Sequence, residues 1–339
     1  MKYLKMIFLL IFSVLFLASC SNLEEHAKRS FFAMDTYMTI TAYGENAETA
    51  VMEASKKISG LEALWSVTDE NSEIYKINHS GGISTEVSPE TADLLKLMLE
   101  ISEATDGALD CTIYPVLTEW GFTTGEYSIP TEERLSELLP LTGWEKISLN
   151  GQTVTIPENM QLDLGAAGKG RAGMLAAEIL RENGVSSALL DLGGNIQTVG
   201  TKPDGSDWRL GIRSPFDDGT LAVIEVSDCA AVTSGGYERY FVGEDGNTYW
   251  HILDPKTGKP ADSGLVSATI IGKDGAVCDA LSTAVFVMGS EKAGELWRQQ
   301  KDFDMILVTG EGEIFITEGI ETSFSLSPSY SEMPVSVIR

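Results

Sequence analysis

The sequence has few basic residues and few histidines. Lysine and arginine together number 24 against 50 aspartates and glutamates, so the 339-residue chain has a formal charge of -26. A surface of that charge repels polyanions, which excludes nucleic acid as a partner and disfavours direct binding to anionic lipid headgroups. An anionic substrate is therefore expected to need a metal ion or a local cluster of donors. The three histidines also leave few candidates for a general base near neutral pH.

Cysteine is scarce as well. The four cysteines are Cys20, Cys111, Cys229 and Cys278. None of them forms a CxxC pair, and an odd number remains once Cys20 is set aside, so we expect neither a disulfide framework nor a zinc site. Internal repeats and low-complexity tracts are also missing. The 43% hydrophobic content allows a substantial core, in one large domain or two ordinary ones.

The one long apolar run lies at the start of the chain, in residues 6–18, after Lys2 and Lys5. It is too short for a membrane span of about 20 residues and fits a secretory signal. Its end, Leu-Ala-Ser-Cys, resembles the lipobox of bacterial lipoproteins, which are cut before a lipid-bearing cysteine. We expect residues 1–19 to be a signal peptide, Cys20 to be lipidated, and residues 20–30 to tether an exported protein to the extracytoplasmic face of the membrane. An ordinary signal peptide is the alternative.

The rest of the chain alternates strand and helix patterns, which predicts an α/β or α+β class. Ser88-Pro89-Glu90 is a strong helix start, and Asn150-Gly151 predicts a hairpin turn. The expected elements are a strand at 31–43, helices at 46–64, 88–105, 168–183, 275–288 and 290–301, hairpins at 147–156 and 304–317, a strand at 188–192, and mostly strands across 208–271. A soft boundary near residue 150 divides the domain predicted at 31–339.

Residues 163–173 are rich in glycine and stand between a strand and a helix. Glycine lets backbone N–H groups approach a ligand and a helix start favours negative charge, so the segment suits a phosphate group. It is not a Walker A loop, because Gly170 follows Lys169 where serine or threonine is required. The glycines do fit the GxGxxG spacing of a nicotinamide-dinucleotide site, with Asp191 about 20 residues further on. An oxidoreductase and a tight turn without ligand are the alternatives.

Asp279 and Thr283 are four residues apart in a predicted helix, so their side chains share one face. A carboxylate and a hydroxyl are hard oxygen ligands for Mg2+, which completes its shell with phosphate and water. The alternative is structural: Asp279 caps a turn and Thr283 bonds back to the backbone.

His251 is a candidate general base, although a structural role would explain it equally. Asp254 precedes a proline in the same segment, a common start for a turn. Gly193 and Gly194 form another glycine-rich loop beside a strand. Such loops either let a large flat ligand approach or are simply tight turns.

Taken in chain order, these segments resemble the ApbE family, the FAD:protein FMN transferases. The resemblance covers about residues 31–310. The matching segments are 33–36, 72–78, 110–117, 120–122, 163–171, 192–196, 234–241, 251–258 and 279–283. The last two closely match His-Ile-Leu-Asp-Pro-x-Thr-Gly and Asp-Ala-Leu-Ser-Thr, which are highly specific together.

The resemblance implies an α+β fold with mixed or antiparallel sheets flanked by helices, in a T-fold-like architecture. It implies an enzyme that binds FAD with Mg2+, transfers FMN to a threonine or serine hydroxyl of an acceptor flavoprotein and releases AMP. In such phosphoryl transfer, positioning and charge stabilisation carry most of the catalysis. The implied acceptors are flavin-carrying subunits of Rnf- or Nqr-type membrane complexes, or extracellular reductases.

The resemblance also implies roles for individual residues. Asp279, Thr283 and the main-chain oxygen of Ala166 would hold Mg2+, and His251 would assist deprotonation of the acceptor hydroxyl, so Asp279 and His251 are the catalytic candidates. The implied FAD contacts are Met34, Trp120, Gly121, Phe122, Asp163, Lys169, Gly193, Gly194, His251 and Asp254.

Four positions depart from the family pattern. Thr68 stands near the place of an aromatic residue that stacks on the flavin, Asp35 and Cys111 replace glycine and proline, and Gly236 replaces a frequent aspartate. None of the four is a proposed metal ligand.

Two other functions fit the same residues. An FAD pyrophosphatase would split FAD into FMN and AMP with water as the acceptor. A non-enzymatic lipoprotein would bind flavin for uptake and leave FAD intact. The strand-rich stretch after residue 208 does not suggest the doubly wound sheet that a nicotinamide enzyme requires.

Overall fold

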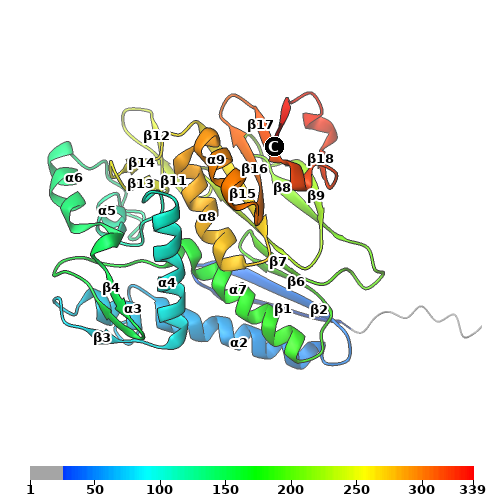
Figure 1. The fold of residues 1–339 in the computed structure, drawn as a ribbon, viewed down its shortest axis with the longest axis horizontal. Coiled ribbons are helices and arrows are strands. Elements are labelled where there is room, and N and C mark those ends of the chain that lie inside the picture. The colour runs from blue at the N-terminus through cyan, green and yellow to red at the C-terminus, as the bar shows by residue number, and fades with distance from the viewer. Residues whose placement is uncertain (1–25) are drawn as a thin grey trace, which may run out of the picture.

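The computed structural model describes residues 26–339 and is built on one nine-stranded sheet (Figure 1). Neighbouring strands are antiparallel except for the last pair, β17 and β19. In sheet order the strands are β1 (His26–Ala33), β2 (Thr36–Tyr43), β6 (Ser187–Leu192), β7 (Asn195–Val199), β10 (Ala230–Gly235), β15 (Leu265–Gly272), β16 (Phe303–Thr309), β17 (Ile314–Thr317) and β19 (Val335–Ile338). The predicted α+β class with a mixed sheet flanked by helices is thus confirmed.

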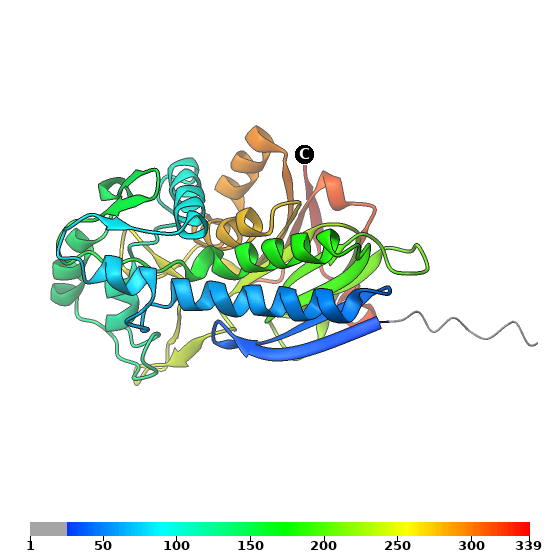
Figure 2. The ribbon, with the colours of Figure 1, turned by 90° about the horizontal axis from the view of Figure 1, so that it is seen from below.

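Helices cover one face of this sheet, and α2 and α7 run side by side along it (Figures 1 and 2). The helices are α2 (Ala47–Trp65), α4 (Pro89–Ala104), α7 (Gly165–Glu182), α8 (Gly275–Met288) and α9 (Ser290–Gln300). Strand residues such as Leu190 and Ile270 are fully buried among them. This layer brings the glycine-rich start of α7 against α8.

A small second sheet covers the opposite face. It consists of β18 (Phe324–Leu326), β9 (Thr220–Val226) and β8 (Trp208–Arg213). Strand β8 alternates buried and exposed residues, which is typical of a strand with one face on the core. Because both faces of the large sheet are covered, the residues of its central strands β7, β10 and β15 are mostly buried on both sides.

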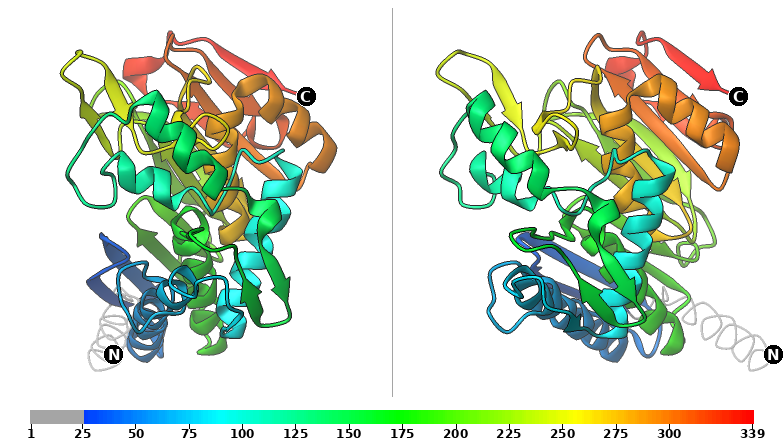
Figure 3. Two further views of the ribbon diagram at one scale, coloured as in Figure 1. Left: turned by 90° about the vertical axis from the view of Figure 1, so that its left-hand side faces the viewer. Right: turned by 60° about the vertical axis from the view of Figure 1, so that its left-hand side comes forward.

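A lobe at the end of the molecule has its own core around Val116, Trp120 and Leu253 (Figure 1, left; Figure 3). Its elements are α5 (Tyr114–Glu119), α6 (Glu132–Leu138), β11 (Tyr240–Val242), β12 (Thr248–Trp250), β13 (Leu253–Asp254) and β14 (Lys259–Pro260). The remaining elements are α3 (Glu73–Asn78), β3 (Thr85–Glu86), β4 (Ser148–Asn150), β5 (Thr153–Thr155) and four 3-10 turns, η1 (Leu139–Leu141), η2 (Trp144–Lys146), η3 (Glu318–Ile320) and η4 (Pro328–Tyr330).

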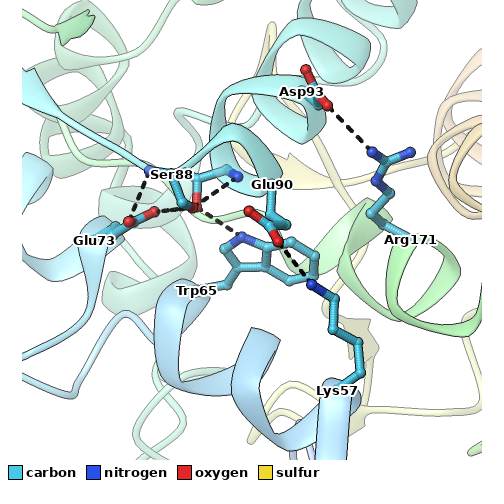
Figure 4. A network of polar contacts seen from close by, with 8 residues as sticks. Lys57, Trp65, Glu73, Ser88, Glu90, Asp93 and Arg171 are labelled. Atoms are coloured by element: carbon cyan, nitrogen blue, oxygen red, sulfur yellow. Dashed lines mark hydrogen bonds and ion pairs between the residues drawn. The ribbon is translucent and has the colours of Figure 1, made fainter. Parts of the chain in front are cut away.

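A polar network joins α3, α4 and α7 (Figure 4). Glu73 accepts hydrogen bonds of 2.8 Å from both the backbone N–H and the hydroxyl of Ser88, the residue that caps α4. Arg171 on α7 pairs with Asp93 on α4 at 3.5 Å. These contacts hold α4 against the first turns of α7.

The predicted strand at 31–43 is wrong in detail. Residues Met34 and Asp35 have φ of 49° and 59° and form a two-residue turn between β1 and β2. Strand β1 begins at His26, so residues 26–30 are strand in a region that the sequence assigned to the tether. The predicted signal peptide and Cys20 lie outside the described residues, and the boundary near residue 150 stays a prediction.

The helix predicted at 168–183 begins earlier, at Gly165. The glycine-rich segment is therefore the first two turns of α7 rather than a loop before it. Helix α4 confirms its predicted start, because Ser88 accepts from the N–H of Thr91 and Pro89 is the first helical residue. None of the helices within residues 26–339 combines the length and the apolar composition that a membrane span needs.

Candidate active site

The start of α7 and the carboxylate of α8 meet directly. The backbone N–H of Gly170 donates to Oδ2 of Asp279 at 2.7 Å, across 109 positions of sequence. In a regular helix that N–H would point at the carbonyl of Ala166. Because the carbonyl oxygen of Ala166 has two lone pairs and the N–H of Gly170 bonds to Asp279, Ala166 has capacity for a further partner. Two motifs predicted separately thus form one site.

Glycine is required here by packing. A Cβ on Gly170 would lie 2.0 Å from the carbonyl oxygen of Gly275, and one on Gly173 would lie 2.4 Å from Nε2 of Gln197. A Cβ on Gly168 would meet only an ordinary contact, 3.7 Å from Trp65. Gly170 and Gly173 therefore let α7 approach α8 and β7 closely.

The alternative of a nicotinamide site is wrong. The strand after α7 is β6, and both of its neighbours, β2 and β7, run antiparallel to it. A dinucleotide fold needs a parallel strand–helix–strand unit at this place. Asp191, the expected ribose partner, accepts instead from the N–H of Gly194 at 3.1 Å, within the turn after β6.

Asp279 is 5% exposed, and burial raises the pKa of its carboxyl, while nearby Lys169 lowers it. Thr283, one turn further along α8, is half-buried and lies 3.3 Å from the hydroxyl of Ser234. Within residues 26–339 no three acidic, histidine or cysteine side chains form a metal cluster. A site with one carboxylate, one hydroxyl and a carbonyl oxygen fits Mg2+, which takes few protein ligands when it binds a phosphorylated substrate.

Sequence analysis missed two buried polar residues on β7. Gln197 donates from Nε2 to the carbonyl of Gly170 at 2.8 Å. Asn195 is 2% exposed, and its side-chain amide helps to lower the pKa of Asp279. Neither the oxygen nor the nitrogen of that amide forms a hydrogen bond of good geometry. An unsatisfied buried amide beside a carboxylate suits a site that receives a ligand. The available signal was the spacing of two, which puts both amides on one face of the strand.

His251 is held by the backbone of Arg239. Its N–H donates to the carbonyl oxygen of Arg239 at 3.0 Å, and its ring Nδ1 lies 3.2 Å from the same oxygen. Because a carbonyl only accepts, Nδ1 carries the proton and Nε2 keeps a free lone pair. Burial lowers the pKa of His251 from 6.5 to about 4, so the ring is neutral near pH 7 and can accept a proton.

Two cations act on the same groups. The charges of Lys169 and Arg239 both lower the pKa of His251, and both oppose the burial that raises the pKa of Asp163. Lys169 is half-buried and, within the described part of the chain, forms no ion pair. Asp163 also accepts from the N–H of Gly165 at 2.7 Å. The motif residues around the start of α7 therefore share one electrostatic environment with His251.

The lobe supplies the aromatic candidates. Trp120 is buried and donates to the carbonyl of Gly258 at 2.8 Å, so it supports the lobe from within. Phe122 is half-buried, with its ring 6.3 Å from that of His251 in an edge arrangement. A Cβ on Gly121 would lie 2.0 Å from the carbonyl oxygen of Glu126. Phe122 is thus the aromatic of this group that lies beside the candidate base.

The remaining candidates lie in turns. Gly193 packs against the hairpin turn of β1 and β2, since a Cβ there would lie 2.2 Å from Oγ1 of Thr36. Met34 in that turn donates its N–H to Glu62 at 2.7 Å. Asp254 accepts from the N–H of Lys256 at 2.9 Å, which fits the structural role of a turn.

Other features lie outside this group. Thr68 is exposed and bonded within its own turn. A surface cleft of about 500 Å³ is lined by residues such as Asn78 and Arg134 and by none of the predicted site residues. Burial raises the pKa of the thiols of Cys111 and Cys229, that of Cys229 to about 11, so neither is a thiolate near neutral pH.

One region of the molecule thus holds three kinds of group. Lys169 and Arg239 can attract an anion, the oxygen atoms of Asp279 and Thr283 suit a hard metal ion, and His251 is a neutral base. This combination is typical of enzymes that transfer a phosphoryl group. Residues 34–307 match the model of the ApbE family, and the chain belongs to that family.

Similar proteins support this assignment. The chain is 32% identical over 291 residues to an FAD:protein FMN transferase of Vibrio cholerae, covering 83% of this chain and 86% of the relative. It is 30% identical over 298 residues to the FAD:protein FMN transferase of Escherichia coli, covering 84% of each. The structure of the ApbE protein of Thermotoga maritima has a TM-score of 0.83 at 31% identity, covering 88% of this chain and 99% of that one. The predicted family and transferase class are confirmed.

Proposed function

We propose that this ApbE-family enzyme transfers FMN from FAD to a threonine or serine hydroxyl of an acceptor flavoprotein, in a reaction that depends on Mg2+ and releases AMP. The observation that carries the proposal is the 2.7 Å hydrogen bond from Gly170 to Asp279. It joins the start of α7, which we propose to bind phosphate, to the carboxylate that we propose to bind the metal ion. The names of the similar proteins supply the flavin substrate.

In this proposal the start of α7 binds the FAD diphosphate. The partial positive charge of the helix start and the ammonium of Lys169 attract the phosphates, which the acidic surface of the chain would otherwise repel. Asp279, Thr283 and the carbonyl oxygen of Ala166 would hold Mg2+, which neutralises charge on the diphosphate when bound. Gly170 and Gly173 let α7 lie close enough to α8 for the N–H of Gly170 to reach Asp279.

His251 acts as the general base in the transfer step. The acceptor hydroxyl oxygen attacks the phosphorus on the FMN side of the diphosphate, and its proton passes to Nε2 of His251. The bond from that phosphorus to the bridging oxygen breaks, and AMP leaves with the electron pair. FMN stays on the acceptor through a phosphoester. Lys169 stabilises negative charge that develops on the phosphate oxygens.

The flavin half of FAD lies, in this proposal, between the lobe and the turns around β2 and β6. Phe122 beside His251 offers an apolar face, and Gly193 and Gly194 allow close approach of the ring. Trp120, Gly121, Met34, Asp163 and Asp254 shape the surrounding segments. Trp120 and Asp254 act through the lobe and the turn that they stabilise, as their hydrogen bonds to Gly258 and Lys256 indicate.

Location and partners complete the proposal. Cleavage before Cys20 and lipidation of its thiol would anchor the enzyme to the extracytoplasmic face of the membrane. Acceptors on that face would be flavin-carrying subunits of Rnf- or Nqr-type complexes, or extracellular reductases. Mass spectrometry of the membrane-extracted protein checks the anchor, because a diacylated N-terminal cysteine has a defined mass.

The test combines the purified chain with FAD, Mg2+ and a candidate acceptor domain. We expect the acceptor to gain the mass of FMN and to fluoresce on a denaturing gel, with an equal amount of AMP released. Asp279→Asn should lower the rate by about 100-fold or more, and EDTA should abolish it. Asp262→Asn is the matched control, because Asp262 is an exposed carboxylate outside the site.

Other outcomes distinguish the alternatives. AMP released without a labelled acceptor, in the presence of several acceptors, would identify an FAD pyrophosphatase. FAD that stays intact and bound would contradict the transferase and support a flavin-binding lipoprotein. Equal rates for Asp279→Asn and the wild type would remove Asp279 from the metal site.

A further inference from the structure

An exposed ion pair crosses from the β1–β2 turn to the segment that holds the candidate base. Oδ2 of Asp35 accepts from Nη2 of Arg239 at 2.8 Å, and the two side chains are 77% and 50% exposed. The residues are 204 positions apart in the sequence. Asp35 has φ of 59°, a left-handed conformation that aspartate and asparagine adopt more readily than most residues. The turn thus presents a carboxylate to this one guanidinium.

Arg239 contacts the candidate base directly, because its carbonyl oxygen lies 3.0 Å from the backbone N and 3.2 Å from Nδ1 of His251. Its charge acts on Asp163, just before the start of α7, and on His251, and Lys169 acts on the same two residues. A guanidinium also offers a fork of N–H donors that matches a phosphate group better than an ammonium does. Arg239 is therefore, after Lys169, the second cation available to an anionic substrate. One of its N–H donors, on Nη2, is already bonded to Asp35.

We infer that Asp35 sets the affinity for the anionic substrate by restraining Arg239 and offsetting its charge. This inference rests on the proposed function, in which FAD is that substrate. To use the guanidinium fully, the diphosphate must share Nη2 with the Asp35 carboxylate or displace it. Because the pair is exposed, the exchange costs little, and Asp35 tunes binding rather than preventing it.

The variant that isolates the charge is Asp35→Asn. Asparagine has nearly the same shape and tolerates the left-handed backbone, so the turn is preserved while the negative charge is lost. We expect the dissociation constant for FAD, measured by flavin fluorescence on the full chain, to fall about two- to five-fold at low salt. The difference should shrink as salt screens the exposed charges. In steady state the KM for FAD should fall while kcat stays unchanged.

Asp106→Asn is a matched control. Asp106 also has a left-handed backbone, with φ of 52°, and also forms an exposed ion pair, with Lys256 at 2.6 Å. It acts on neither Asp163 nor His251, so its loss should leave the FAD affinity unchanged. A general effect of removing one negative charge from this acidic chain would appear in both variants.

A double-mutant cycle assigns the effect to Arg239. We expect Arg239→Gln to weaken FAD binding, and Asp35→Asn to add no further change in that background. An unchanged or weaker affinity in Asp35→Asn, an equal gain in Asp106→Asn, or additive effects in the double variant would overturn the inference. If the wild-type chain binds no FAD at all, the proposed function fails, and the inference fails with it. A wild type that transfers FMN together with an unaltered Asp35→Asn would overturn the inference alone.

Discussion

The two sides of the candidate active site, the proposed phosphate side and the proposed base side, are built in different ways. On the phosphate side, Gly170 and Asp279 are buried between α7 and α8, and their contact is fixed by backbone packing. On the base side, His251 is held by one carbonyl oxygen, and the nearby ion pair of Asp35 and Arg239 is exposed. The phosphate side therefore has one conformation that the core dictates, whereas contacts on the base side exchange at low cost.

The difference has a functional meaning. Every FAD molecule presents the same diphosphate group, so a rigid site for that group needs no adjustment. The acceptor is a whole protein, and in the proposed mechanism its hydroxyl must reach His251 from outside. The exposed ion pair beside His251 can rearrange at low cost, which suits the approach of a large partner to the candidate base. Substitutions on each side should consequently fail in different ways.

The largest effect is expected from His251→Gln, on the base side. Loss of a general base lowers kcat by about 10²- to 10⁴-fold, while the dissociation constant for FAD should hardly change. Flavin fluorescence measures binding, and acceptor labelling measures transfer. His79→Gln is the control, because His79 is an exposed histidine away from the site. Equal losses of binding and transfer in His251→Gln would instead make His251 a binding residue.

The low pKa of His251 should also make folding stability depend on pH. The pKa of His251 is about 4 in the folded protein against 6.5 in an unfolded chain. As pH falls from 6.5 towards 4, the unfolded state takes up the proton first, so the stability contributed by His251 is present above 6.5 and lost across that window. For the same reason kcat/KM should not decline as pH falls through 6.5. An NMR titration in which the His251 signal moves near 6.5 would contradict this.

Gly170→Ala should have the next largest effect, this time on folding. Its Cβ would overlap the carbonyl oxygen of Gly275, and such overpacking costs about 3 kcal/mol. Denaturant unfolding measures the loss, and FAD binding should fall with it. Gly60→Ala is the matched control, because Gly60 is an exposed glycine inside α2 with open space around it. There alanine should stabilise the protein by about 0.5 to 1 kcal/mol. Similar results for both variants would refute the packing argument.

Much of the site could be predicted from local patterns. The spacing of Asp279 and Thr283 on one helix face needs only the helical period, and Ser88 with Pro89 marks a helix start by its own chemistry. These features depend on residues close together in the sequence. In the structure these residues therefore lie where the sequence patterns indicated.

What could not be predicted depends on contacts distant in the sequence. The glycine spacing of 168–173 fits a dinucleotide loop equally well, and only the antiparallel pairing of β6 shows that two of the glycines serve helix packing. Asn195 and Arg239 lie in the matched segments 192–196 and 234–241, but the pattern did not single them out, because their importance comes from neighbours on other elements. The break at Met34 and Asp35 was missed because neither residue is glycine, the usual signal of such a turn.

The smallest expected effect tests the other use of glycine, in the turn after β6. Gly194 has φ of 88°, and a Cβ added to it would have no atom within 4 Å, so its need for glycine comes from the backbone alone, in contrast to Gly170. Gly194→Ala should cost about 1 kcal/mol of folding free energy. Gly194→Asn should cost less, because asparagine tolerates left-handed conformations. Denaturant unfolding of both variants provides the measurement. If alanine and asparagine cost the same, packing or a bound flavin, rather than the backbone angle, explains this glycine, and the contrast between the two segments disappears.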